Sequence, residues 1–60
     1  MQVGDLVRHE MWTDQKAPAL VLWVGALQEN DTQMIKIFDP DDGIPTWDNS
    51  KDYEVISESR

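Results

Sequence analysis

Short apolar runs separated by polar turns make up this chain, and the clearest of them covers residues 33–38. Apolar and polar positions alternate there. Ile35 and Ile37 share one face, while Met34 and Phe38 share the other. Strict alternation is typical of a β-strand that is buried on one side. The pattern therefore predicts a strand over residues 33–38, and the other runs are expected to pack around it.

Four further runs are predicted to form strands. The run at 19–24 is continuously apolar, but it is short, rich in Val and Trp, and bounded by Pro18 and Gly25, which favours a strand over a helix. Because Pro45 has no N–H to donate, its strand is expected at an edge or a bulge. The three remaining predicted strands cover residues 3–8, 44–47 and 53–56.

Polar segments with turn-forming residues separate these strands. Asn30 and Asp31 tolerate positive φ and predict a hairpin turn. Residues 39–43, DPDDG, are the strongest turn signal, because Pro presets φ and Gly supplies the left-handed position. Residues 48–51 suit a single 3₁₀ turn, and residues 9–16 have no periodicity and predict a loop.

The predicted fold is all-β, a single domain over residues 1–60 whose five short strands curl into a small barrel with one 3₁₀ turn before the last strand. Residues 57–60 are expected to fray. Trp47 is expected to be at least half buried. Alternation predicts an inward-facing set, namely Val3, Val7, Leu20, Leu22, Val24, Ile35, Ile37, Ile44, Tyr53 and Val55.

Composition narrows the classes of partner. The net charge of −7 opposes direct binding to nucleic-acid phosphates and to anionic membranes, and it favours basic partners. The chain has no Cys and one His, which excludes a disulfide and a zinc site of the usual kind. No run is long enough for a membrane span and no signal pattern opens the chain, so we expect a cytoplasmic protein.

The motifs VGDLVRH, ALVLWV, MIKIFDPDDGI with a following Trp, and KDYEVIS resemble a group of very small SH3-like barrel proteins of bacteriophages, including marine phages. The resemblance covers nearly the whole chain and implies an SH3-like fold and a phage origin. The chain departs from the pattern at Phe38, where a Trp is usual, and at Pro40 and Pro45. The resemblance carries no established activity.

Catalytic and metal-binding hypotheses find little support in the residues. The DPDDG segment differs from an EF-hand loop in its spacing and has no closing Glu, so a turn explains it and no metal is expected. His9 with Glu10 and Asp14 lacks a second His and a nucleophile. We therefore expect neither an enzyme nor a cofactor, and no small-molecule substrate.

The aromatic residues are the most informative candidates for binding. With Leu20, Leu22 and Val24 inward, Trp23 would lie outward beside Met34 and Phe38 on the neighbouring strand. Two alternatives stay open at this point. Either the long loop covers this face with Trp12 as its lid, or the face is an interface.

The resemblance to SH3-like and Tudor-like barrels implies a ligand groove beside the first long loop, with Trp12 and Trp47 as its rings. Such a groove would suit a basic or proline-containing peptide. An acidic rim would flank it, made of Glu10, Asp14, Asp48 and Asp52.

The leading functional hypothesis is a non-enzymatic protein-interaction module that binds a host or phage protein through this aromatic face. One alternative is an acidic nucleic-acid mimic that inhibits a host nucleic-acid-binding protein, although the acids cluster in loops. The other is a structural, homo-oligomeric or virion-associated piece that uses Trp23, Met34 and Phe38 as a symmetric contact.

Overall fold

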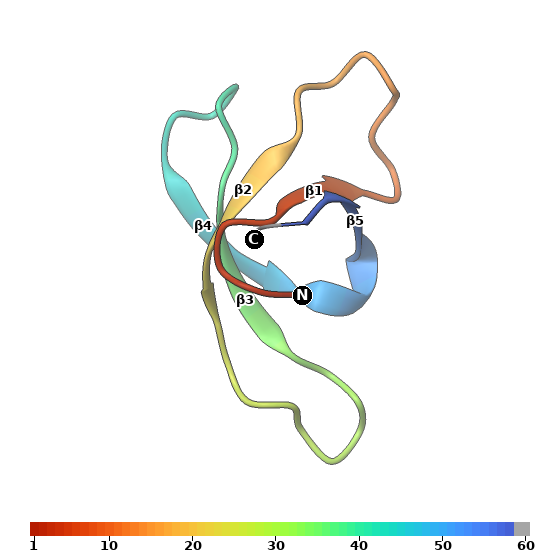
Figure 1. The fold of residues 1–60 in the computed structure, drawn as a ribbon, viewed down its shortest axis with the longest axis vertical. Helices are drawn as coiled ribbons and strands as arrows, with labels where there is room; N and C mark the ends of the chain where they lie inside the picture. Colours follow the sequence, from red (N-terminus) through yellow and green to blue (C-terminus); the bar gives the residue numbers. More distant parts are fainter. Residues whose placement is uncertain (59–60) are drawn as a thin grey trace.

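The computed structural model describes residues 1–58 as one antiparallel sheet of five strands with a single 3₁₀ turn (Figure 1). This confirms the all-β prediction. All five predicted strands are present; the strand over residues 19–24 has its predicted bounds, and the others are shifted by a few residues. The elements are β1 (Leu6–His9), β2 (Ala19–Val24), β3 (Met34–Phe38), β4 (Pro45–Asn49), the 3₁₀ turn η1 (Ser50–Asp52) and β5 (Tyr53–Ser57).

The strands lie in the order β4-β3-β2-β1-β5, so β4 and β5 are the edges of the sheet. Within residues 1–58 no ladder joins the two edges, and closure into a barrel stays a prediction. The β1–β2 and β3–β4 loops leave the sheet at one end and the β2–β3 loop at the other (Figure 1). Loops distant in sequence are thereby brought together at one end of the molecule.

The core lies on one face of the sheet, where buried side chains from neighbouring strands stand side by side. Val7 pairs with Ala19 and with Val55, and Val21 pairs with Ile37. The fully buried set is Val7, Ala19, Val21, Ile35 and Ile37, against which Trp12, Val24, Tyr53 and Val55 pack. Of the predicted inward set, Val7, Val24, Ile35, Ile37, Tyr53 and Val55 are therefore confirmed as core or core-packing residues.

The predicted orientation of β2 was wrong over its first half. Val21 is fully buried, whereas Leu20 and Leu22 are 37% and 38% exposed. The pairing register with β3 shifts between Val21 and Trp23. This irregularity adds one residue to the strand, so Val24 returns to the core side although Leu22 does not. Alternation counted backwards from Val24 therefore assigns the wrong face to every residue before the bulge.

Three other predictions of burial were also wrong. Val3 is 56% exposed because β1 begins only at Leu6, after a turn in which the Asp5 N–H donates to the Gln2 carbonyl. Ile44 is 61% exposed because it lies in the turn before the edge strand β4. Trp47 is 55% exposed because it pairs with Lys36 on the face opposite the core.

The turns have the backbone geometry that their residues predict. Asp31 has φ 62° and Gly43 has φ 74°, and the Gly43 N–H donates to the Asp39 carbonyl at 2.9 Å. The Gly4 N–H donates to the Val21 carbonyl at 2.9 Å, so the backbone of β2 passes close to that glycine. Ser57 is the last residue of β5, and residues 59–60 of the predicted frayed tail lie outside the described residues.

Candidate functional site

The residues that sequence reasoning grouped into one binding face lie on two opposite faces of the sheet. Trp23, Met34 and Trp47 lie on the face away from the core, and Phe38 shares that face but is only partly exposed. Trp12 instead packs against the core on the other face. Trp12 and Trp47, the two rings expected to line one groove, therefore lie on opposite faces of the sheet.

We call Leu20, Trp23, Met34, Phe38 and Trp47 the outer aromatic face. Its centre is a row across three strands in which Trp23 pairs with Lys36 and Lys36 pairs with Trp47. The two indole rings meet edge to face with centroids 5.1 Å apart, and the Lys36 ammonium lies 5.4 Å from the Trp47 ring centroid. Both rings are about half exposed, at 47% for Trp23 and 55% for Trp47.

A glycine holds Trp23 against the sheet. A Cβ on Gly25 would lie 2.8 Å from the Trp23 ring, too close for any real contact, so the ring occupies the space that a larger residue would fill. The Gly25 N–H donates to the Met34 carbonyl at 2.8 Å, which fixes the backbone below the ring. The position of Trp23 is therefore set by local packing, and its exposed edge is presented outward.

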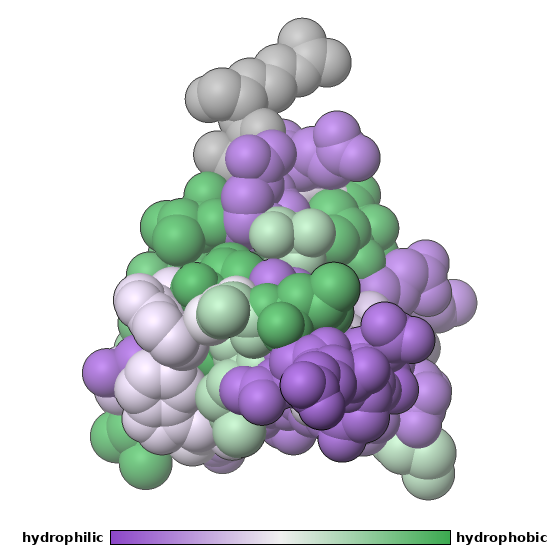
Figure 2. All heavy atoms as spheres, turned by 90° about the horizontal axis from the view of Figure 1, so that it is seen from below, coloured by the Kyte–Doolittle hydropathy of each residue, from purple (hydrophilic) through white to green (hydrophobic). Residues whose placement is uncertain are grey.

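The outer aromatic face carries little charge, although the chain has twelve acidic residues. In the rows where β2, β3 and β4 pair, the outward positions are Leu20, Phe38, Pro45, Trp23, Lys36, Trp47, Met34 and Asn49. Lys36 is the one charged residue among them. Seen from the end with the β2–β3 loop, hydrophobic residues form a band beside a separate block of hydrophilic residues (Figure 2).

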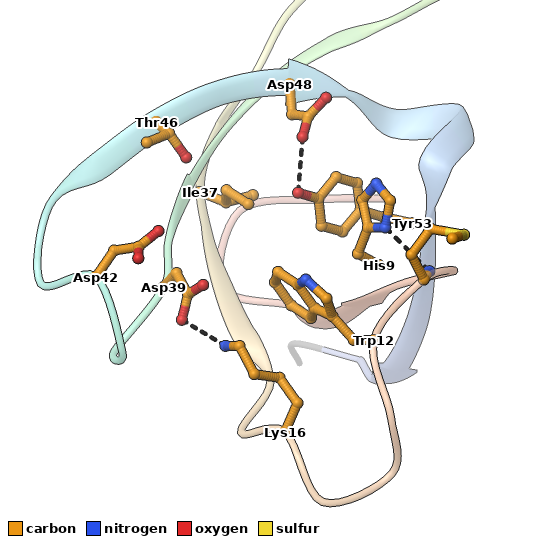
Figure 3. Close-up of a pocket in the computed structure, with 10 residues that line it drawn as sticks. His9, Trp12, Lys16, Ile37, Asp39, Asp42, Thr46, Asp48 and Tyr53 are labelled. Carbon is orange, nitrogen blue, oxygen red and sulfur yellow. Dashed lines mark hydrogen bonds and ion pairs between the residues drawn. The ribbon is translucent and has the colours of Figure 1, made fainter.

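The long loop does not cover this face. Trp12 turns to the core side of the sheet, where it contacts His9 and Tyr53 with ring centroids at 5.8 Å and 5.7 Å. His9 and Tyr53 also meet edge to face at 5.0 Å. These three rings form one wall of a pocket of about 500 Å³ (Figure 3).

Lys16 closes one side of this pocket. Its ammonium lies 4.2 Å from the Trp12 ring centroid, 2.6 Å from the Asp39 carboxylate and 3.0 Å from the Asp41 carboxylate. The hydrogen bond from Lys16 lowers the pKa of Asp39, and the same bond raises the pKa of Lys16. We call this set, Trp12, Lys16, Asp39 and Asp41, the lysine clasp. It joins the β1–β2 loop to the β3–β4 turn.

Asp48 and Tyr53 form the far side of the pocket (Figure 3). The Tyr53 hydroxyl donates to the Asp48 carboxylate at 2.8 Å, and the other oxygen of Asp48 accepts from the Asn49 N–H at 2.8 Å. Burial, together with the bond to Asp48, raises the pKa of Tyr53, so its hydroxyl keeps its proton at neutral pH. Asp48 therefore presents a fixed negative charge beside the rings.

Of the predicted acidic rim, only Asp48 lines the pocket. Asp14 is almost fully exposed and lies 3.4 Å from Arg8. The Glu10 N–H donates to the Asp52 carbonyl at 2.9 Å, which ties the start of the long loop to η1. Glu10 and Asp14 lie between β1 and β2, and Asp52 is the last residue of η1.

Sequence reasoning missed most of the pocket. It assigned Tyr53 to the core, His9 to a loop and Asp39 to a turn, and it gave no role to Lys16. Lys16 and Asp39 are 23 positions apart, and neither lies in a recognisable motif with the other. The one available signal was the DPDDG turn, whose first Asp is confirmed as a turn residue because it accepts from the Asp41 N–H.

The side chains of the pocket and of the outer aromatic face are of types that attract cations and apolar surface. Aromatic faces with nearby carboxylates attract cations, and an exposed tryptophan pair attracts apolar surface. Within residues 1–58 no three His, Asp or Glu side chains are grouped to hold a metal ion.

Nor does any helix among those residues have the length and apolarity to cross a membrane. Comparison of the chain with protein-family models, curated proteins and solved structures finds no match.

Proposed function

We propose that this protein is a non-enzymatic interaction module that binds a partner protein through the outer aromatic face. One observation carries the proposal: two half-exposed tryptophans in contact, on a sheet face that the chain's own long loop leaves open. Tryptophan is among the residues that most often dominate binding energy at protein interfaces. A contiguous apolar area on a small domain is a recurrent sign of a binding surface.

The charges describe the partner. The interface centre is apolar and holds a single cation, Lys36, whereas the acidic residues lie mainly in the loops and turns around it. A matching partner has an apolar centre that receives Trp23 and Trp47. Its periphery is basic, because a net charge of −7 favours approach of positive surfaces.

The resemblance in sequence motifs extends the proposal to fold and origin. The open five-stranded sheet with a 3₁₀ turn before β5 is compatible with an SH3-like barrel, and we assign it to that architecture as part of the proposal. The protein then acts in the cytoplasm of an infected bacterium on a host or phage protein, or as a minor part of the virion.

The proposal is tested by site-specific photo-crosslinking in the cells that express the protein. A photoreactive phenylalanine analogue replaces Trp47 in one variant and Leu27 in another. Leu27 is 66% exposed on the opposite β2–β3 loop and serves as the matched control. We expect a discrete covalent adduct from position 47 and none from position 27, with its components identified by mass spectrometry.

Competition separates specific binding from mere exposure. Unlabelled wild-type protein should suppress the adduct, whereas unlabelled Trp23→Ser protein should not. The same adduct from both positions, or equal competition by Trp23→Ser, would contradict the proposal. An adduct between two copies of the chain would show that the partner is a second copy, and that the chain self-associates through the same face.

A further inference from the structure

We propose that the pocket on the core side of the sheet is a binding site for an alkylammonium group, the group that ends a lysine side chain, carried by a polypeptide partner. The site is separate from the outer aromatic face, and the inference does not rest on the function proposed for that face. Its walls are the rings of His9, Trp12 and Tyr53 and the carboxylates of Asp42 and Asp48 (Figure 3).

The chain's own Lys16 demonstrates the chemistry. Its ammonium lies over the Trp12 ring at 4.2 Å and touches the Asp39 carboxylate at 2.6 Å. An aromatic face and a carboxylate are the two groups that hold an organic cation most effectively in a partly desolvated site. The pocket therefore already holds one cation of the proposed class, at the side formed by the long loop.

The side chains lining the pocket carry more negative than positive charge, which favours a second cation. Three carboxylates, those of Asp39, Asp42 and Asp48, face one ammonium, that of Lys16. Asp39 is neutralised by Lys16. Asp48 accepts only neutral donors, and no hydrogen bond or ion pair with another of residues 1–58 engages the Asp42 carboxylate. Asp42 on the β3–β4 turn and Asp48 on the far side of the pocket are thus without a cation (Figure 3).

The far side of the pocket also combines an aromatic ring with a carboxylate, those of Tyr53 and Asp48. Tyr53 stands edge-on to Trp12 at 5.7 Å, and its hydroxyl holds Asp48 in place. A volume of about 500 Å³ exceeds what an ammonium with its methylene chain occupies. An incoming lysine side chain would place its methylenes along the rings and its ammonium between Asp42 and Asp48.

The test uses the full chain labelled with ¹⁵N and the probe Nα-acetyl-lysine amide. The three tryptophan indole N–H signals report on the two faces separately, because Trp12 lies in the pocket while Trp23 and Trp47 lie on the outer aromatic face. We expect a saturable shift of the Trp12 signal with no shift of the other two. The same probe acetylated at Nζ, which has no charge, should give no shift.

Two variants examine the charges. Asp42→Asn should weaken binding by roughly threefold or more, the equivalent of one exposed charge contact. Lys16→Met keeps the methylene stem but removes the competing ammonium, and it should strengthen binding by a similar factor. Asp42 is exposed, so its variant should keep the fold if Lys16→Met does not.

A saturable Trp12 shift that requires the charged probe and weakens in Asp42→Asn supports the inference. Equal shifts with the acetylated probe, unchanged affinity in Asp42→Asn, or no shift in the wild-type protein would overturn it. A shift at Trp23 and Trp47 alone would assign the lysine to the outer aromatic face and would overturn it as well.

Discussion

Ile37 and Ile44 carry the same side chain in very different surroundings. Ile37 is 2% exposed between Val21 and Thr46 on the core side, whereas Ile44 is 61% exposed in the turn before β4. In a chain of 60 residues the core is small, so each buried methylene is a considerable share of the net stability.

Replacing each isoleucine with valine removes one methylene from either environment. Ile37→Val should lower the free energy of unfolding by about 1 kcal/mol, because it removes buried apolar volume from a packed site. Ile44→Val should change it by less than about 0.5 kcal/mol. Urea denaturation followed by far-ultraviolet circular dichroism measures both. Equal losses in the two variants would contradict the assigned core.

At the scale of elements, the β3–β4 turn shows how backbone and side chain share one task. Asp39 accepts N–H bonds from Asp42 and Gly43 through its carbonyl and one from Asp41 through its carboxylate. Gly43 adopts φ 74°, and a Cβ there would meet no other atom within 4 Å. The requirement for glycine is therefore conformational and not steric.

We predict that Gly43→Ala destabilises the protein by about 1 kcal/mol, because a Cβ disfavours the left-handed region. Gly43→Asn should cost less, since Asn tolerates that region. Thermal denaturation of the two variants beside the wild type measures the difference. If Asn costs as much as Ala, the turn does not require a left-handed residue at this position.

Glycine is required at position 25 for a different reason, which is steric. A Cβ there would collide with the Trp23 ring, which is a movable side chain, so Gly25→Ala should displace the ring more than it unfolds the sheet. The position of Trp23 in the outer aromatic face thus depends on a residue outside that face. The outer aromatic face also depends on the bulge after Val21, because the bulge determines which side chains of β2 lie on that face.

At the scale of the whole molecule, the lysine clasp joins two loops that leave the sheet at the same end (Figure 1). The clasp is electrostatic, so its contribution depends on pH. Lys16 lowers the pKa of Asp39 below its ordinary value of 3.8. The folded protein therefore binds fewer protons at this carboxylate than the unfolded chain does in that pH range.

The clasp should stabilise the fold fully above pH 3.8, and its contribution should disappear as the pH falls through the lowered pKa of Asp39. At the alkaline end, the raised pKa of Lys16 keeps the contribution constant up to pH 10.5 and removes it only above that value. The difference in unfolding free energy between wild type and Asp39→Asn, measured by urea denaturation across this pH range, separates the contribution of the clasp from those of the other carboxylates. A difference that stays the same from neutral pH to the acid end of the range would contradict it.

The sequence by itself determined the elements of this protein. Alternation over Ile35 and Ile37, the apolar run of β2, and the turn residues at 31 and 43 predict where the five strands lie along the chain. These are local properties, since period and turn chemistry depend only on neighbours along the chain. Composition likewise determined the net charge of −7.

The tertiary structure decided the faces. The bulge in β2 places Val21 in the core in place of the predicted Leu20, and no local pattern in the sequence marks the bulge. The sheet separates Trp12 from Trp23 and Trp47, and it brings Lys16 to Asp39 across 23 positions. Such contacts depend on pairing register and loop direction, which are set by the packing of the whole sheet. The candidate sites therefore became visible only once the strands were placed beside one another.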